Sequence, residues 1–265
     1  MASLFAGVVN TGIICKSQWL TRFTNAQFTS PPKQACWMLI DLAVHPEWRE
    51  RCKKEIQDLL SVHLGDSSPA TLSEKFRAIP LSVWEDELPI LEACIRESHR
   101  ISSTGAALRR NLREDIKIGE QVVKSGDFLA YPMGDVHLNP EYYPEPDKYD
   151  PGRWLRPDPL PNAAYTFLGW GAGRHPCTGM RAARLEMKLI MAMFLTRYEF
   201  DLVDEDGKFP NPVPVRNRND VQQARAGCWV VVFCTNAHPV FSLCLDSSPW
   251  SHMLLRLQEG CAVGG

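Results

Sequence analysis

Cys177 lies in a glycine-rich loop whose residue types and spacing could bind a metal through sulfur. The loop reads Trp170-Gly-Ala-Gly-Arg-His-Pro-Cys177-Thr-Gly179 and comes directly before a stretch with helical periodicity. A cysteine at a helix N-terminus meets unpaired backbone N–H groups and the positive end of the helix dipole, and both favour the thiolate over the thiol. A structural cysteine in a tight turn is the alternative, but the spacing of the whole loop favours a ligand.

The neighbours of this cysteine suit a flat, bulky ligand that carries acidic groups at its rim. Glycines such as Gly171 allow a ligand of this shape to approach the backbone closely. Arg174 and His175 are cationic donors for carboxylates. The loop is therefore suited to a flat, bulky ligand with carboxylates at its rim.

A second pattern, Glu97-Ser-His-Arg100, lies upstream in a stretch with helical periodicity. Residues three apart share a face of a helix, so Glu97 and Arg100 can form an ion pair. Taken alone, this spacing favours an ordinary ion pair on the surface.

The loop resembles the cysteine-ligand loop of cytochrome P450 enzymes, which is usually written F-x-x-G-x-[RH]-x-C-x-G. It matches at Gly173, His175, Cys177 and Gly179, and Trp170 stands where phenylalanine is usual, which keeps an aromatic ring against the sulfur and adds an N–H. The resemblance implies that Cys177 is the axial thiolate ligand of a haem iron. It also implies a mainly α fold with small β-sheets, here the truncated C-terminal, haem-binding half.

The resemblance extends to a structural triad. Glu97 and Arg100 match the family's E-x-x-R motif, and the segment around Arg153 resembles the one that supplies a second arginine to that glutamate. A buried carboxylate between two guanidiniums can be fully satisfied, whereas loss of one partner leaves a stranded charge. Without the resemblance, Arg153 is interpreted as a solvated surface residue.

Three further assignments follow from the resemblance. Residues 101–111 are expected to line the substrate pocket, and Arg110 or its neighbour Arg109 to meet a haem propionate.

The segment Ala6-Gly-Val-Val-Asn10-Thr11 resembles the oxygen-activating part of the distal helix, where Thr11 can fill the alcohol role in proton relay. Asn10 stands where an acid is usual, and an amide can bind water through hydrogen bonds but does not titrate. His137, in the stretch after the last short strand, is interpreted as a satisfied structural histidine.

The activity that the resemblance implies is insertion of one oxygen atom from dioxygen into a small apolar organic substrate, such as a terpenoid, steroid or other secondary metabolite. Electrons would come from NADPH through a cytochrome P450 reductase, as in eukaryotic, fungal-like members. Full-length relatives of this kind lie in the endoplasmic reticulum membrane, and a chain without the anchor would be cytoplasmic or peripheral. The alternatives are a truncated, non-catalytic product and a fragment that holds haem without turnover.

The elements that must position these residues can be predicted from periodicity and from turn residues. Helices are expected from residue 35 to a break before Pro46, from Pro46 onward, over 84–99 and over 177–198, with Pro31 and Pro32 as a breaker. Short strands are expected near 115–118, 121–123 and 128–131, and over 227–233. Prolines between 140 and 161 predict an extended, meandering path with few backbone donors.

The composition of the chain argues against several classes of partner and site. The chain has 265 residues, a net charge of −2 and an ordinary balance of hydrophobic and charged residues, so no nucleic-acid partner is expected. Its nine cysteines include no C-x-x-C pair, which argues against a zinc site, and no apolar run is long enough for a membrane span. The domains are expected to be a partial distal helix (1–13), an atypical insertion resembling a translated intron (14–34), the haem-binding core (35–225) and an atypical tail (226–265).

Overall fold

The computed structural model describes residues 30–64, 71–103, 105–157, 165–174, 176–203, 208–213, 215–216, 229–234, 239–244 and 256–257. Asn10, Thr11 and His175 lie outside these residues, as do residues 1–13 and most of 14–34. The helices of the described residues are α3 (Ser30–Val44), α4 (Pro46–Leu64), α5 (Leu72–Ala78), α6 (Leu81–Asp86), α7 (Pro89–Ser102), α8 (Met133–His137), the 3-10 turn η1 (Pro151–Trp154) and α9 (Met180–Arg197).

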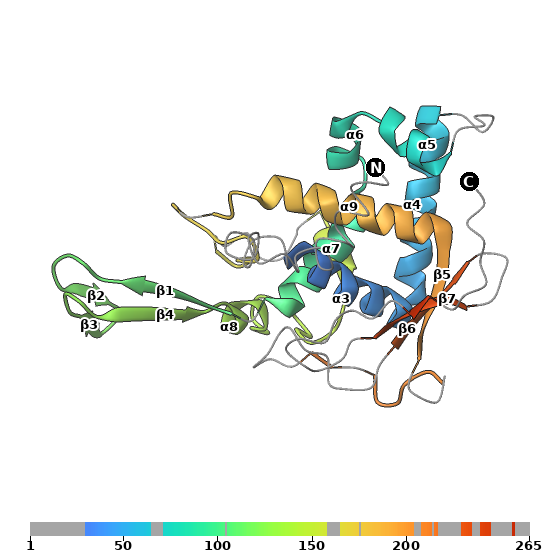
Figure 1. Cartoon of the computed structure of the whole chain (residues 1–265). Helices are drawn as coiled ribbons and strands as arrows, with labels where there is room; N and C mark the ends of the chain where they lie inside the picture. The colour runs from blue at the N-terminus through green and yellow to red at the C-terminus, as the bar shows by residue number, and fades with distance from the viewer. Residues whose placement is uncertain are drawn as a thin grey trace, which may run out of the picture.

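Four helices form the body of the molecule. In Figure 1, α9 crosses α4 and α7, and α3 lies beside them; α3 contacts both α7 and α9, and α4 contacts the same two helices. Residues at spacings of three and four along α4 face this core: Trp48, Cys52, Ile56 and Leu59. Full burial of each large apolar side chain contributes about 1.5–3 kcal/mol, so the packing of these helices is the main source of stability.

The start of helix α7, which carries Glu97 and Arg100, is set by a proline in its sequence and by a contact with α4. Pro89 occupies the first helical position, where its missing N–H and fixed φ are tolerated. The next two backbone N–H groups, of Ile90 and Leu91, donate to the Glu55 carboxylate of α4 at 2.7 and 2.8 Å. The Glu55 side chain of α4 thus caps α7 and fixes the position of the two helices relative to each other.

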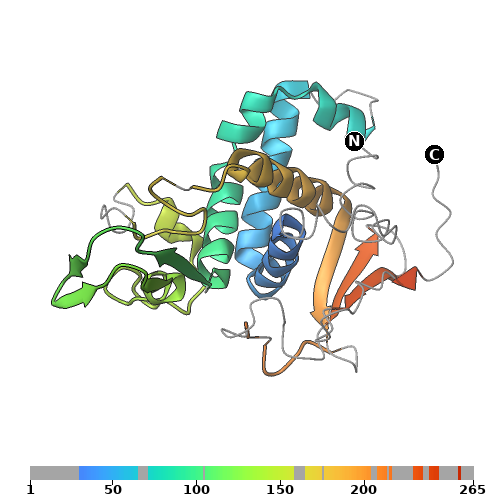
Figure 2. The same ribbon diagram turned by 60° about the vertical axis from the view of Figure 1, so that its left-hand side comes forward.

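Two short antiparallel ribbons and one four-stranded sheet complete the fold. Their strands are β1 (Ala106–Arg110), β2 (Ile116–Ile118), β3 (Gln121–Val123), β4 (Phe128–Pro132), β5 (Tyr198–Val203), β6 (Trp229–Cys234), β7 (Pro239–Cys244) and β8 (Arg256–Leu257). Strand β1 pairs with β4, β2 pairs with β3, and the sheet has the order β5-β6-β7-β8. Figures 1 and 2 show the ribbons projecting from the helical body and the larger sheet lying beyond the C-terminal end of α9.

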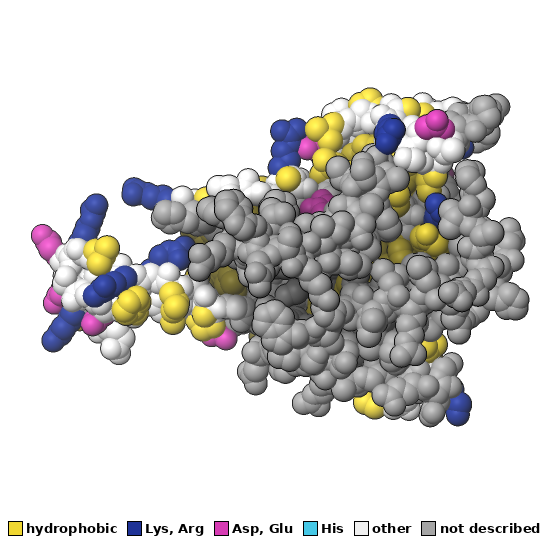
Figure 3. All heavy atoms as spheres, viewed as in Figure 1, with side chains coloured by type: hydrophobic (Ala, Val, Ile, Leu, Met, Phe, Trp, Pro, Cys, Tyr) yellow, Lys and Arg dark blue, Asp and Glu magenta, His cyan; other side chains and the backbone are white. Residues whose placement is uncertain are grey.

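The projecting ribbon is paired from Ala106 with Pro132 to Arg110 with Phe128. Its large apolar side chains are exposed, including Leu108, Phe128 and Tyr131. Figure 3 shows basic, acidic and hydrophobic side chains together at this end of the molecule.

Several predicted boundaries need correction. The predicted 84–99 helix is two helices, α6 and α7, because Pro89 disfavours helical geometry at Leu88, where φ is −123° and ψ is 62°. Helix α3 begins at Ser30 rather than at residue 35. Pro31 and Pro32 therefore stand in its first turn, where N–H groups have no helical partner, and do not break it. The last long helix begins at Met180, since residues 177–179 form the turn that leads into it.

The other predicted elements agree more closely with the structure. The three short strands before residue 133 are present as β2, β3 and β4, and the strand expected at 227–233 is β6. Strand β1 was not predicted, and neither was β7 in the segment interpreted as an atypical tail. The insertion and the tail stay predictions about the origin of those segments.

Candidate functional site

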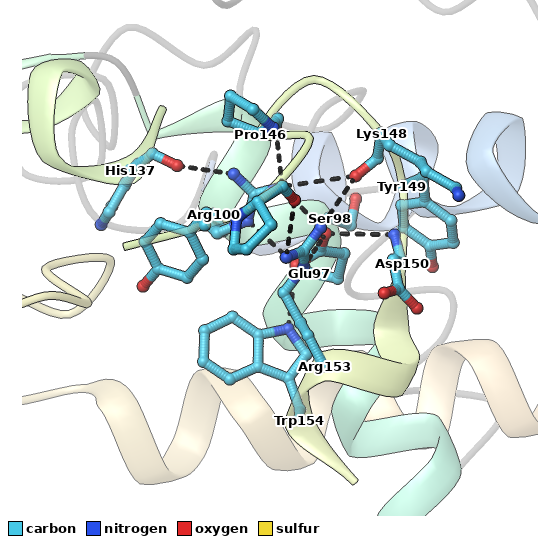
Figure 4. Close-up of polar contacts among 12 residues, drawn as sticks. Glu97, Ser98, Arg100, His137, Pro146, Lys148, Tyr149, Asp150, Arg153 and Trp154 are labelled. Carbon is cyan, nitrogen blue, oxygen red and sulfur yellow. Dashed lines mark hydrogen bonds and ion pairs between the residues drawn. The ribbon is translucent and has the colours of Figure 1, made fainter. Parts of the chain in front are cut away.

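Glu97 of α7 lies at the centre of a buried polar network, which Figure 4 shows. Its carboxylate pairs with Arg100 in a bidentate arrangement, Nε to Oε2 at 3.0 Å and Nη2 to Oε1 at 2.8 Å. Arg153 of η1 donates from Nε to Oε1 at 2.9 Å. Glu97 and Arg100 are fully buried and Arg153 is 2% exposed, so the structure brings the three residues of the proposed triad together inside the protein.

The two guanidiniums also hold the segment between α8 and η1. Arg100 donates to the carbonyl oxygens of His137 at 2.5 Å and Pro146 at 2.8 Å, and Arg153 donates to that of Pro144 at 3.3 Å. The guanidinium of Arg100 lies 4.8 Å from the centre of the buried Tyr143 ring, within the range of a cation–π interaction. The network therefore fixes this segment, called the meander below (residues 138–150), against α7.

Two donors to Glu97 were missed by the sequence interpretation. The indole Nε1 of Trp154 donates to Oε2 at 2.9 Å, and the backbone N–H of Asp150 donates to Oε1 at 3.1 Å. The guanidinium of Arg96 lies 4.0 Å from the centre of the Trp154 ring, on the outer side of α7. The signal for Trp154 was its place directly after Arg153, which puts an aromatic N–H beside the same carboxylate.

Two histidines, the fully buried His137 and the half-buried His99, lie between this network and the cysteine loop (residues 170–179). The ring of His137 bonds the Ser103 carbonyl oxygen through Nδ1 at 3.0 Å and accepts the Leu168 N–H at Nε2 at 2.8 Å. His99 packs edge-on against Trp170, with ring centres 4.5 Å apart, and its buried Nδ1 has no hydrogen-bond partner among the described residues. The pKa of each imidazole is lowered to about 4, mainly by burial, and the proximity of His137 contributes to the shift of His99.

The cysteine loop folds back on itself before α9. The backbone N–H of Cys177 donates to the carbonyl oxygen of Trp170 at 2.6 Å, and the N–H of Gly171 donates to that of Leu168 at 2.9 Å. Gly171 and Gly173 have φ values of 71° and 68°, a left-handed geometry that favours glycine. The loop therefore has the conformation that only its glycines allow without strain.

Cys177 is exposed, two residues before the N-cap of α9, Gly179. Among the described residues, no heavy atom would lie within 4 Å of a Cβ atom added at Gly173 or at Gly179. Arg174 is exposed next to it. The sulfur is thus accessible to a large group approaching the loop.

The donor set fits haem better than a bare metal ion. Within the described ranges, no group of three or more His, Cys, Asp or Glu side chains could hold a metal. A single exposed cysteine can instead complete the coordination of a metal that brings its other ligands in a macrocycle, as haem does.

Arg110 and Arg109 lie on the exposed ribbon strand β1. Arg110 donates from Nε to the Gly126 carbonyl oxygen at 3.1 Å, and Arg109 donates to the carbonyl oxygen of Leu108 at 2.8 Å. Their assignment to a propionate, like the assignments of His175, Asn10 and Thr11, stays a prediction. Among the helices that the structure describes, none is long and apolar enough to cross a membrane.

Comparisons with known proteins match the region that holds these features. The cytochrome P450 family model matches residues 34–217. The chain is 37% identical over 175 residues to cytochrome P450 monooxygenase AacuE of Aspergillus aculeatus (64% of this chain, 35% of that protein). It is 34% identical over 187 residues to cytochrome P450 monooxygenase nsrP of Aspergillus novofumigatus (69% and 36%).

An animal protein is also similar to this chain. Human cytochrome P450 4F12 is 30% identical over 199 residues, which is 74% of this chain and 34% of that protein. The chain therefore spans about a third of the length of the curated relatives that it matches. Because the family model covers well over half of the chain, including the buried glutamate–arginine network and the cysteine loop, the chain belongs to the cytochrome P450 family.

Proposed function

We propose that this chain is the C-terminal, haem-binding half of a haem-thiolate monooxygenase, with Cys177 as the axial ligand of the iron. The observation that carries the proposal is the exposed Cys177 at the end of a loop closed by its own backbone hydrogen bond to Trp170. Haem held by a thiolate supplies dioxygen activation, because the sulfur donates electron density that favours O–O cleavage.

The chain's own residues bind and orient that group. The sulfur of Cys177 is the ligand, Trp170 and Gly171 shape the loop, and Arg174 and His175 are donors for the carboxylates at the haem's rim. Arg110 is a further donor from the ribbon. The protein's contribution in such enzymes is to bind the cofactor, orient the substrate and exclude water.

The remaining parts of the proposal concern reaction partners. The substrate class is a small apolar organic molecule, such as a secondary metabolite of terpenoid or steroid type, and one oxygen atom of dioxygen is inserted into it. Electrons come from NADPH through a cytochrome P450 reductase. Thr11, with Asn10 beside it, is the candidate for passing protons to the distal side.

Haem ligation is tested on the expressed chain loaded with one equivalent of haem. After reduction and addition of carbon monoxide, a thiolate ligand gives a red-shifted Soret band in the difference spectrum. The matched control is Cys177→Ser, which keeps the size of the side chain and removes the sulfur. We expect the band in the wild type and not in the variant; a wild type without the band, or a variant that keeps it, would contradict the assignment.

Turnover needs a separate measurement, because a chain can hold haem without catalysis. The loaded chain is mixed with NADPH and a cytochrome P450 reductase, and oxidation of NADPH and of a panel of apolar substrates is followed. Oxygenated product supports the monooxygenase. The Soret band without product supports the alternative function, a haem-binding fragment.

A further inference from the structure

His137 connects the buried Glu97 network to the cysteine loop through both its main chain and its ring. Its carbonyl oxygen accepts from Arg100 at 2.5 Å, while its ring nitrogens bond Ser103 and Leu168. Arg100 and Ser103 lie on α7 and directly after it, whereas Leu168 leads into the cysteine loop. One fully buried residue thus joins two parts of the chain that are distant in sequence.

The hydrogen-bond pattern requires one form of the imidazole. Nδ1 faces a carbonyl oxygen and must carry the proton, while Nε2 accepts from an N–H and must be unprotonated. The ring also stacks on Phe167, with centres 5.4 Å apart and planes 25° apart. Burial and the nearby Arg100 guanidinium both disfavour a charged ring, and His99 is the other titratable group beside it.

A continuous set of backbone hydrogen bonds leads from this ring to the ligand. The carbonyl oxygen of Leu168 accepts from Gly171, and that of Trp170 accepts from Cys177. The position of Leu168 therefore determines where the turn begins that ends at the sulfur-bearing residue. Displacing Leu168 would move the acceptor of the Cys177 N–H.

We propose that His137 is a positioning residue for the cysteine loop, which transmits the fixed geometry of the Glu97–Arg100 pair to the backbone of Cys177. It acts through its hydrogen bond with the backbone N–H of Leu168. The inference rests on the proposed function only in naming Cys177 as the ligand, since the effect on the backbone is measurable without haem.

The test is backbone amide hydrogen exchange on the full chain without haem. His137→Phe keeps an aromatic ring for stacking on Phe167 but removes both polar contacts. His137→Gln keeps an acceptor for the Leu168 N–H. We expect His137→Phe to raise the exchange rates of the Leu168, Gly171 and Cys177 amides about tenfold relative to the α4 amides, since a buried hydrogen bond is lost, and His137→Gln to restore most of the protection.

The control for the loss of an imidazole is His45→Phe. The Nδ1 of His45 bonds the Asp41 carbonyl oxygen at 2.9 Å, and its ring packs on Tyr149 rather than on a residue of the loop. This variant is expected to leave the ratio of Cys177 to α4 exchange unchanged.

Each other outcome of the exchange experiment overturns the inference. Faster exchange at Leu168 without a change at Cys177 would show that the effect stops at Leu168. An equal rise in the α4 amides would show that His137 acts on global stability alone, and no recovery with glutamine would exclude the Leu168 contact as the cause. Failure of the wild type to bind haem would refute the proposed function and leave this result intact.

Discussion

At the scale of single residues, Glu97 determines whether two buried cations are tolerated. Its two oxygens accept five hydrogen bonds, from Arg100 twice and once each from Arg153, Trp154 and the Asp150 backbone. Removing the Glu97 charge costs more free energy of unfolding than the ion pairs contribute on their own. The reason is that the two guanidiniums would remain buried without a counter-ion.

Glu97→Gln is expected to lower the free energy of unfolding by about 3–5 kcal/mol, since both guanidiniums lose their counter-ion while buried. Urea denaturation of wild type and variant measures this difference. The control is Glu145→Gln, which removes the exposed Glu145–Lys148 pair, with 74% and 60% exposed side chains; it should cost about 1 kcal/mol or less. Equal losses in the two variants would contradict a special role for burial.

Trp154→Phe isolates a single donor. The substitution removes the N–H that reaches Glu97 and keeps an aromatic face for Arg96. We expect a loss of about 1.5–3 kcal/mol in unfolding free energy, the usual contribution of a hydrogen bond to a charged group. If Trp154→Phe and wild type denature at the same urea concentration, water replaces the indole at no cost and the donor is dispensable.

At the scale of elements, α4 and α7 are joined by polar and apolar contacts along the same interface. Glu55 of α4 caps the N-terminus of α7. In the same interface, the sulfur of Cys52 in α4 lies 3.6 Å from the sulfur of Cys94 in α7, and both cysteines are fully buried. The E-x-x-R residues belong to the later turns of α7. The position of the glutamate network therefore depends on how α4 holds the start of that helix.

Glu55→Ala should destabilise the chain by about 1–2 kcal/mol, because the Ile90 and Leu91 N–H groups lose their acceptor. Thermal or urea unfolding gives the total cost, and amide exchange at Ile90 and Leu91 locates it. Glu50→Ala on the same helix serves as the control, since the Glu50 side chain is 63% exposed. Unchanged exchange at the start of α7 would show that water replaces the cap.

At the scale of the whole molecule, two neutral histidines couple stability to pH. The pKa of His99 and of His137 is about 4 in the folded chain, against 6.5 for an ordinary histidine, because burial disfavours the charged form. Between these values the unfolded state binds more protons than the folded state. The stability from each neutral ring is therefore fully present above pH 6.5 and is lost as the pH falls towards 4.

The unfolding free energy is accordingly expected to fall by about 2–3 kcal/mol for each of these histidines between pH 6.5 and 4. Urea titrations at several pH values measure the slope, and the double variant His99→Gln, His137→Gln should flatten it over this window. A double variant whose stability curve runs parallel to that of the wild type would contradict the assignment.

The sequence allowed prediction of those parts of the site that depend on short spacings. The cysteine loop and the Glu97–Arg100 pair are local patterns, and periodicity placed α4 and α9 within a few residues. The contacts of His137 with Leu168 and of Trp154 with Glu97 join residues 31 and 57 positions apart. No spacing rule indicates them, because they depend on how the meander packs against α7. Strand β1 was missed for a different reason: its residues show no alternation of buried and exposed positions, so period-two patterning does not indicate a strand there.

The arginine contacts with the meander compensate for a shortage of hydrogen-bond donors in that segment. A proline contributes a carbonyl oxygen but no N–H, so a segment with prolines at 140, 144 and 146 has more acceptors than donors of its own. Arg100 and Arg153 supply the missing donors to Pro144, Pro146 and Lys148. The arginines therefore serve this segment through the N–H groups that they donate to its carbonyl oxygens, as well as serving Glu97 through their charge. A lysine in either place would preserve the charge and leave part of that backbone without a partner.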